Sequence, residues 1–290
     1  MKGRTITLIA GPTASGKSAL ALQMAQENNA VIINADSMQI YDVLNILTAR
    51  PTQADTAIAP HYLYGYVSPS VSYSVGKWLC DVEKLLTRFA SKSLIFVGGT
   101  GLYFRALLEG IAKVPYVPDA VRQKWRALLD KEGAESLYRQ LVQVDTVLAE
   151  KISSHDGQRI VRALEVYEAT NKKLSWWQKQ KTTPLIAPYV AEKILLIPPR
   201  QLLYERIHRR LDSMIERGAL EEVMAIKKLA LSPLLPAMKA IGIAEFIAYL
   251  DGQQSFEKAL EMVKTQTRRY AKRQMTWFRN QFDEEWMLLF

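Results

Sequence analysis

The sequence predicts an α/β protein in which a parallel sheet is flanked by helices and an all-helical domain is inserted. Short apolar segments alternate with helical patterns from the N-terminus to residue 104, as in sheets that are covered on both faces. The segment "GPTASGKS", residues 11–18, follows the first apolar segment and has the spacing of a phosphate-binding loop. The expected core is therefore P-loop NTPase-like. Residues 119–183 show helical patterns and no convincing strand, which indicates the insertion.

The elements of the sheet region follow in the order that a parallel sheet requires. Each expected strand is a short apolar run, and each expected helix has apolar residues at helical spacing. The strands are expected at 4–10, 30–36, the start of 93–104 and 189–199, and the helices at 17–28 and 72–90. In 93–104 the strand is followed by a glycine turn and the start of a further helix.

The domain boundary is expected where this rhythm stops. The segment "GIAKVPYVPDA", residues 110–120, contains prolines and has no periodicity. We therefore expect a core made of residues 1–112 and 186–290, and an inserted helical domain over 113–185. After the returning strand the sequence shows helical patterns, and the last expected helix is long and runs from about 255 to 281.

The composition limits the class of protein. The chain has 290 residues and a formal net charge of +9, which favours a polyanionic partner without indicating a fold. Cys80 is the only cysteine, so an internal disulfide is excluded, and the three histidines are far apart, which argues against structural zinc. No run approaches the ~18 apolar residues that cross a bilayer. We expect a cytoplasmic monomer with no membrane partner.

The phosphate-binding loop lies between an expected strand and an expected helix, the context that gives its spacing meaning. Glycines allow the backbone to approach an anion, and the N–H groups of the loop and of the helix N-terminus point towards it. Lys17 supplies a positive charge, and the Ser18 hydroxyl suits a magnesium ligand. The expected diphosphate- or nucleotide-binding residues are Gly11, Pro12, Thr13, Ala14, Ser15, Gly16, Lys17 and Ser18.

The acidic residue near the expected phosphate site follows the second strand, whereas in many NTPases such a residue ends a different strand. The third strand ends in "LIFVGGTG" without the aspartate that supports the metal in many NTPases, whereas Asp36 follows the second strand in "INADSMQIY". Asp36 lies at the carboxyl edge of the sheet, where it can act as a general base. The alternative is that Asp36 caps a helix over 37–41. Small-molecule kinases can also carry an acid at this place.

Taken together, these segments resemble one family, the tRNA dimethylallyltransferases. The resemblance runs from residue 11 to residue 281 and rests on "GPTASGKS", "NADSMQIY", "PHYLYGYV", "GGTGLYFRALLEG", "GQRIVRALEVYEATNK" and "QTRRYAKRQMTWFRNQ". It implies transfer of a dimethylallyl group from its diphosphate to N6 of the adenosine 3′-adjacent to the anticodon, with release of diphosphate. It also implies Mg²⁺, held in part by Ser18, and a compact enzyme of bacterial type.

The resemblance also implies roles for individual residues. Asp36 accepts the proton of the attacking amine, Thr100 helps to position that amine, and Arg210 contacts the diphosphate. Arg206 and Arg209 lie in the same run, so the sequence leaves open which arginine grips the diphosphate. The target base must leave a stacked loop to reach the site, and Gln39 offers both a donor and an acceptor to read its edge.

Contacts with the tRNA anticodon stem-loop are expected from several segments. The expected residues are Asp36, Ser37, Met38, Gln39, Thr100, Arg122, Gln158, Arg159, Ile160, Val161, Arg162, Lys239, Gly242, Arg269 and Arg273. The last two belong to six cations of the final helix that have few acids nearby. Two alternatives are open for the final helix: a solvated face, or arginines that face the donor diphosphate instead of the tRNA. For Arg159 and Arg162 the alternative is pairing with Asp156 or Glu165. In "KAIGIAEF", Ile243 and Ala244 replace the polar pair of many relatives, which puts contacts from those side chains in doubt.

Three other functions fit parts of the sequence. A prenyltransferase acting on free adenine nucleotide would use the same chemistry, but the basic final helix and the helical insertion argue against so small an acceptor. A P-loop small-molecule kinase would hold ATP in the loop. A non-catalytic tRNA-binding protein would keep the loop as a remnant, although the intact Gly16, Lys17, Ser18 and Asp36 argue against decay.

Overall fold

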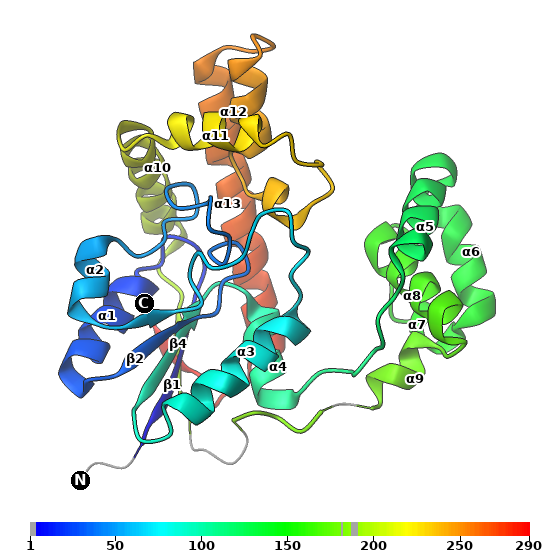
Figure 1. The fold of residues 1–290 in the computed structure, drawn as a ribbon, viewed down its shortest axis with the longest axis horizontal. Coiled ribbons are helices and arrows are strands. Elements are labelled where there is room, and N and C mark those ends of the chain that lie inside the picture. The colour runs from blue at the N-terminus through cyan, green and yellow to red at the C-terminus, as the bar shows by residue number, and fades with distance from the viewer. Residues whose placement is uncertain (1–3, 181, 187–190) are drawn as a thin grey trace. The chain divides into compact units, whose positions relative to one another are not determined.

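The computed structural model describes residues 4–180, 182–186 and 191–290, and its chain divides into two compact units. Unit 1 comprises Met1–Leu108 and Leu185–Phe290, and unit 2 comprises Glu109–Pro184 (Figure 1). The chain passes from unit 1 to unit 2 at residues 108–109, before the boundary expected at 113. Helix α4 ends at Glu109, and Gly110 then turns the chain with a φ of 72°.

Unit 1 is built on a six-stranded sheet in the order β3-β2-β4-β1-β5-β6, and every paired neighbour is parallel. This arrangement confirms the predicted fold class. The strands are β1 Ile6–Ala10, β2 Val31–Asn34, β3 His61–Tyr62, β4 Leu94–Gly98, β5 Ala191–Leu196 and β6 Met287–Leu289. The first two residues of the returning strand expected at 189–199 lie outside the described residues.

Alternate side chains of the sheet enter two different cores, as the period of two in a strand requires. Ile95 and Val97 of β4 pack with Ala21 and Ala25 of helix α1 on one face. Phe96 meets the ring of Trp78 on the other face, with ring centroids 6.4 Å apart. Both faces are therefore covered, which explains why the central strands are continuous apolar runs.

The helices of unit 1 agree with most of the expected positions, and the long final helix forms as expected (Figure 1). They are α1 Lys17–Asn28, α2 Gln53–Ile58, α3 Val75–Arg88, α4 Gly101–Glu109, α10 Arg200–Glu216, α11 Ala219–Lys228, η1 Pro236–Lys239, α12 Ile243–Leu250 and α13 Phe256–Gln281. Two strands, β3 and β6, and two short helices, α2 and η1, were not expected. Strand β3 has two residues and α2 has no buried residue, so neither produces an apolar pattern, and the apolar run of β6 is only three exposed residues long.

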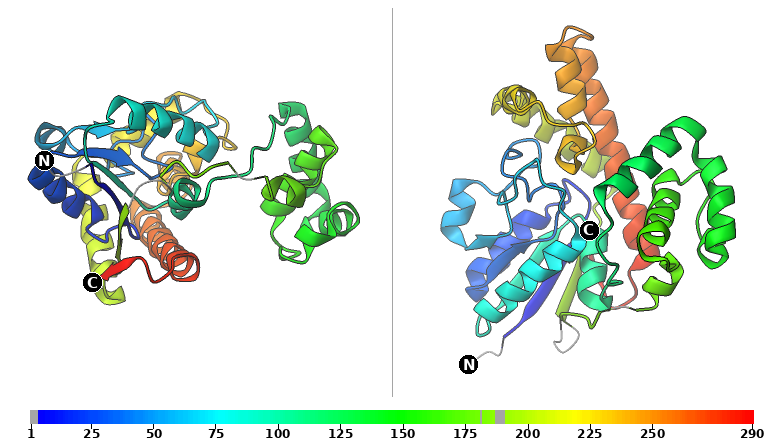
Figure 2. Two further views of the ribbon diagram at one scale, coloured as in Figure 1. Left: turned by 90° about the horizontal axis from the view of Figure 1, so that it is seen from below. Right: turned by 45° about the vertical axis from the view of Figure 1, so that its right-hand side comes forward.

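Unit 2 consists of helices over its described residues, and they gather into a bundle of their own (Figure 2). The helices are α5 Asp119–Glu132, α6 Ala134–Val144, α7 Thr146–Ala149, α8 Gly157–Thr170 and α9 Leu174–Gln178. Leu137, Leu141, Ile160 and Leu164 are each 2% exposed or less and form the centre of a separate core. Unit 2 therefore carries its own apolar interior, as a domain does.

Candidate active site

The carboxyl ends of three adjacent strands bring the expected site residues together in unit 1. Asp36 follows β2, Thr100 follows β4 and the phosphate-binding loop follows β1. Strand β4 lies between β2 and β1 in the sheet, so the glycine turn that carries Thr100 separates Asp36 from the loop. Ligands of open parallel sheets bind at this edge, where neighbouring connections diverge.

The loop adopts the wrapped backbone that an anion cradle requires. Ala14 and Gly16 both have positive φ values, 62° and 97°. Helix α1 starts directly afterwards at Lys17, and no side chain caps its N-terminus. The first N–H groups of α1 are therefore available to an anion. The Lys17 ammonium donates to the carbonyl oxygen of Pro12 at 3.2 Å, which folds it back over the loop.

The electrostatics of the loop favour an anionic ligand. Burial lowers the pKa of Lys17 to about 8, while the negative charge of Asp36 raises it and the positive charge of Arg210 lowers it further. Burial is the largest cause of this shift because it disfavours the charged form. A bound diphosphate would place negative charge beside the Lys17 ammonium and so stabilise its charged form.

Two arginines of α10 face the loop. Arg206 donates to the carbonyl oxygen of Ser15 at 3.2 Å, and Arg210 donates to the hydroxyl of Thr13 at 3.3 Å and to the carbonyl oxygen of Thr48 at 3.4 Å. Both line the cavity over the loop, together with Arg217, whereas Arg209 does not line it and is exposed. The geometry thus favours Arg206 and Arg210 over Arg209 as diphosphate contacts.

Asp36 is held at the base of the cavity by short-range hydrogen bonds. Its backbone N–H donates to the Asn34 side chain at 2.8 Å, and its Oδ1 accepts from the backbone N–H of Met38 at 2.9 Å. The alternative role as a helix cap is wrong, because no helix forms over 37–41 and Asp36 closes a turn instead. Its Oδ2 has no protein hydrogen bond among the described residues.

The residues after Asp36 make specific contacts of their own. The Thr100 hydroxyl accepts from the backbone N–H of Ser37 at 3.0 Å and donates to the Ser37 hydroxyl at 3.3 Å. The Gln39 amide donates to the carbonyl oxygens of Thr48 and Ala49 at 2.8 and 3.0 Å. The backbone thus uses the amide nitrogen of Gln39, whereas its side-chain oxygen can still accept a hydrogen bond from a base.

Gln274 of α13 joins two parts of the site and was missed as a functional residue. Its side-chain oxygen accepts from the backbone N–H of Thr13 at 2.9 Å, and its nitrogen donates to the carbonyl oxygen of Gly99 at 2.9 Å. One buried amide thus fixes the distance between the loop and the glycine turn. Gln274 lies in "YAKRQMTWFR", a segment whose cations predict an anion contact but whose single glutamine has no sequence pattern that predicts a role.

Two connected cavities occupy the site. The first has a volume of about 410 Å³ and contains the loop, Lys17, Ser18 and the arginines. The second has about 280 Å³ and contains an apolar wall made of Met38, Leu47, Ile207, Leu211, Met214, Ala240 and Ile241. Asp36, Thr13, Thr48, Arg210 and Met214 line both. A charged group and an apolar group of one ligand can therefore lie on either side of Asp36.

The "KAIGIAEF" segment borders the second cavity only in part. Lys239 is exposed and lines it. Gly242 has a φ of 104° and caps α12, with its N–H donating to Glu245 at 3.1 Å. Ile243 is 1% exposed and belongs to the core, whereas Ala244 is exposed. Ile243 thus makes no contact in the cavity, and its apolar character is explained by packing.

The cations at positions 264–273 of α13 fall into two groups, those without an acidic partner and those paired with an acid. Arg269, Lys272 and Arg273 line a shallow groove with Trp277 and have no acidic partner among the described residues. Lys264 instead pairs with Asp212 at 2.8 Å.

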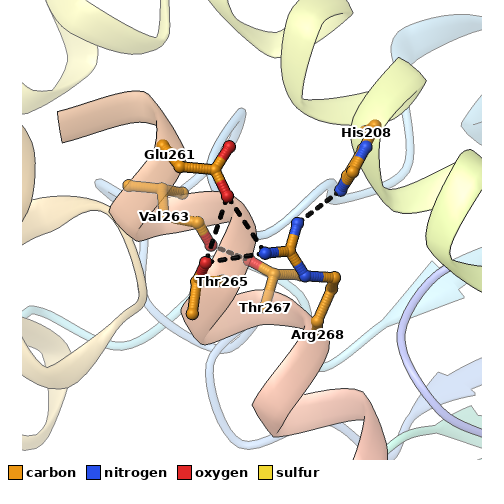
Figure 3. Close-up of polar contacts among 6 residues, drawn as sticks. All are labelled: His208, Glu261, Val263, Thr265, Thr267 and Arg268. Carbon is orange, nitrogen blue, oxygen red and sulfur yellow. Dashed lines mark hydrogen bonds and ion pairs between the residues drawn. The ribbon is translucent and has the colours of Figure 1, made fainter. Parts of the chain in front are cut away.

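Arg268 belongs to the second group. It bonds to Glu261 and Thr265 on one side and to His208 on the other (Figure 3). The expectation of six cations with few acids nearby is wrong for Arg268 and Lys264.

The expected residues of unit 2 differ in exposure. Arg159 is paired with Asp156 at 3.2 Å and Arg162 with Glu165 at 3.7 Å, so the pairings that competed with an RNA contact are present. Arg159 remains 70% exposed, and Gln158 is exposed beside it.

Ile160 and Val161 are 0% and 5% exposed. Their side chains belong to the core of unit 2, so a tRNA contact at these two positions would have to come from the backbone. Arg122 is partly exposed, pairs with Asp119 at 3.7 Å and lies over the ring of Tyr116, which is 70% exposed.

The described residues contain no cluster of three or more His, Cys, Asp or Glu side chains that could hold a metal ion by themselves. Ser18 and Asp36 nevertheless line the same cavity as the loop. A magnesium ion needs few protein ligands when phosphate oxygens and water complete its shell, so these residues fit a metal that arrives with a diphosphate. No helix among the described residues is long and apolar enough to cross a membrane.

Comparisons with known proteins point to one family. A family model described as IPP transferase matches residues 39–281, and a model described as isopentenyl transferase matches residues 4–63. The chain is 84% identical over 289 residues to a protein of Bartonella henselae named tRNA dimethylallyltransferase, and the match covers all of both chains. It is 53% identical over 282 residues to a protein of the same name from a Chelativorans species, with 97% of each chain covered.

Two solved structures are similar as well. One is the full-length tRNA isopentenylpyrophosphate transferase of Bacillus halodurans, with a TM-score of 0.68, 31% identity, and 99% of this chain and 89% of that chain covered. The other is a eukaryotic dimethylallyltransferase acting on tRNA, with a TM-score of 0.78, 30% identity, and 96% of this chain and 70% of that chain covered.

Proposed function

This chain belongs to the IPP transferase family and is a prenyltransferase that modifies tRNA; we propose that its donor is dimethylallyl diphosphate. The acceptor is N6 of the adenosine 3′-adjacent to the anticodon, and diphosphate is the leaving group. The observation that carries the proposal is a pair of cavities that share Asp36 in their lining, one of them cationic and the other with an apolar wall. An allylic diphosphate has the same division into a charged head and a short apolar tail.

The diphosphate head is bound by fixed positive groups. Lys17, Arg206 and Arg210 surround the loop, whose N–H groups complete the cradle. Negative charge grows on the diphosphate as the allylic carbon–oxygen bond breaks, so donors that are already in place stabilise the transition state more than the ground state. Magnesium held by Ser18 and the diphosphate oxygens would add positive charge to the leaving group.

The residues where the two cavities meet account for the electron pair and the proton of the transfer step. The carbon–oxygen bond breaks and its electron pair leaves with the diphosphate, while the lone pair of N6 forms the new carbon–nitrogen bond. The amine then carries an excess proton, which Asp36 accepts through the free Oδ2. Thr100, whose hydroxyl is fixed by Ser37, lies beside Asp36 and can orient the amine. Positioning and proton removal of this kind contribute large factors to the rate.

The tRNA is held through cations that line or surround the second cavity and through cations of unit 2. Arg269 and Arg273 on α13 have no acidic partner among the described residues and lie at or beside the cavity opening. Arg122, Arg159 and Arg162 of unit 2 are further phosphate contacts in this proposal. Lys239 and the turn at Gly242 flank the place where the flipped adenine enters. Phosphate contacts position the RNA, whereas contacts to the base inside the cavity specify it.

One assay tests this function against its rivals. The protein is incubated with magnesium, labelled dimethylallyl diphosphate and either unmodified tRNA, AMP or neither. We expect label on tRNA only. Label on AMP alone would indicate a nucleotide prenyltransferase, and consumption of ATP without prenyl transfer would indicate a kinase. A gel-filtration measurement tests the expected monomer, and cell fractionation tests the expected cytoplasmic location.

A further inference from the structure

A carboxylate of α11 holds the loop that follows Asp36 and its neighbours. Glu222 accepts hydrogen bonds from the backbone N–H groups of Asn45, Ile46 and Leu47 at 2.9, 2.7 and 3.0 Å. Three successive amide donors on one charged acceptor make a strong anchor. The anchor joins segments about 175 residues apart in sequence, so the position of residues 45–47 depends on it.

The held loop forms one wall of the active-site cavity. Leu47 lines the apolar cavity and Thr48 lines both cavities. The Thr48 carbonyl oxygen also accepts from Gln39 and Arg210, which ties the loop to the diphosphate side. On its other side Leu47 packs against the core cluster that contains Ile243.

Leu47 differs from the helical residues of the apolar wall in the backbone that holds it in position. Ile207, Leu211 and Met214 project from helix α10, where their positions follow from the helix itself. Leu47 is carried by irregular backbone, and the Glu222 carboxylate replaces the regular hydrogen bonds that the loop lacks. The cavity of about 280 Å³ must take both the prenyl tail and the flipped adenine, so it has little spare room.

We propose that Leu47, held in place by Glu222, limits the length of the prenyl chain that the enzyme accepts. The wild-type cavity admits a five-carbon allylic diphosphate and excludes a ten-carbon one. Glu222 is a positioning residue in this arrangement, because it acts through the backbone of residues 45–47 and does not touch the ligand. The inference rests on the proposed function, since it concerns the donor of that reaction.

The test compares kcat/KM for dimethylallyl diphosphate and geranyl diphosphate with the same tRNA. For Leu47→Ala we expect the ratio of geranyl to dimethylallyl transfer to rise at least tenfold, because one methylene at a tight apolar wall already gives roughly tenfold or more discrimination. Glu222→Gln keeps the shape but places an amide hydrogen among three N–H donors, so it should raise the ratio by a smaller factor. Glu221→Gln, an exposed neighbour on the same helix, is the matched control and should leave the ratio unchanged.

The outcomes separate the inference from the function. If the wild-type enzyme transfers the five-carbon group and Leu47→Ala retains the same donor preference, the inference is overturned while the function stands. If the wild type transfers neither group to tRNA, both are overturned. Should Leu47→Ala fail to fold, Leu47→Val removes less volume and must still raise the ratio; an unchanged ratio in a folded Leu47→Val with dimethylallyl activity also overturns the inference.

Discussion

The arginines of the two units differ in the partners that their guanidinium groups have before an anion binds. In unit 1, Arg206 and Arg210 donate to neutral backbone and hydroxyl oxygens and have no ion-pair partner among the described residues. In unit 2, Arg122, Arg159 and Arg162 each pair with a carboxylate three residues away in sequence, at 3.2 to 3.7 Å.

This difference fits two different tasks. A partly buried guanidinium held by neutral oxygens has no carboxylate to give up when an anionic ligand arrives, which suits chemistry. Arg159, whose side chain is 70% exposed, must exchange Asp156 for a phosphate, and exposed pairs of this kind contribute only ~0.2–1 kcal/mol. Arg162 differs, because its partner Glu165 is only 6% exposed. The exchange at Arg159 is inexpensive and reversible, which suits binding and release of a large RNA.

The largest expected effect belongs to the junction in unit 1. Asp36→Asn removes the proton acceptor but keeps the size of the side chain, so we expect single-turnover transfer to fall by about 10²- to 10⁴-fold. Binding of tRNA should change little, because the phosphate contacts lie elsewhere. Asp42→Asn, an exposed acid six residues later, is the control. Near-normal turnover in Asp36→Asn would remove the carboxylate from the reaction.

The next effect separates the two neighbouring arginines of α10. Arg210→Ala removes a partly buried charge that contacts Thr13, and we expect the KM for the prenyl donor to rise by about 10- to 100-fold, since a hydrogen bond to a charged group contributes ~1.5–3 kcal/mol. Arg209→Ala removes an exposed arginine one position earlier and should leave that KM within about twofold. Equal effects of the two substitutions would contradict the partly buried, preorganised arrangement.

The sequence predicted the layout of this site but not the contacts between distant segments. The strands β1, β2 and β4 are short, buried and mostly apolar runs, so their order of appearance predicted that Asp36, the glycine turn and the loop share one edge of the sheet. Gln274 and Glu222 act across 261 and about 175 residues, and no local pattern reveals such a pairing. In unit 2 the resemblance marked residues 158–162 as a block, although the helical period places Ile160 and Val161 towards the core.

The pH dependence of donor binding tests the role of Lys17. Its folded pKa of about 8 lies below the usual range, so Lys17 loses its charge as the pH rises through 8. We expect kcat/KM for the donor to fall about tenfold between pH 7 and pH 9, because the neutral amine no longer attracts the diphosphate. The kcat at saturating donor should fall less, since the bound diphosphate raises the pKa again. Lys17→Arg keeps the charge and should flatten the profile; a Lys17→Arg enzyme with the same decline would assign it to another group.

A smaller effect is expected on the basic groove of α13. Replacing Arg269 and Arg273 by Gln removes two cations, and each lost phosphate contact should reduce the slope of log K against log salt by about 0.7–0.9. Replacing Lys264 and Arg268 by Gln removes the same charge from positions that are already paired with acids, and should change the slope less. A slope that is equal in both double variants would show that net charge, and not the groove, controls RNA binding.

The smallest effect tests the exchange of partners in unit 2 directly. Asp156 competes with phosphate for Arg159, so Asp156→Asn should tighten tRNA binding about two- to fivefold, in line with the small energy of an exposed ion pair. The substitution keeps α8 intact, because the Asp156 side chain caps that helix by accepting from the Arg159 N–H at 3.2 Å and asparagine caps equally well. Glu150→Gln removes an equally negative, exposed residue of unit 2 without an ion-pair partner among the described residues, and it controls for net charge. Tighter binding in Asp156→Asn alone would show that Arg159 exchanges a carboxylate for RNA, whereas equal gains in both variants would reduce the role of unit 2 to its overall charge.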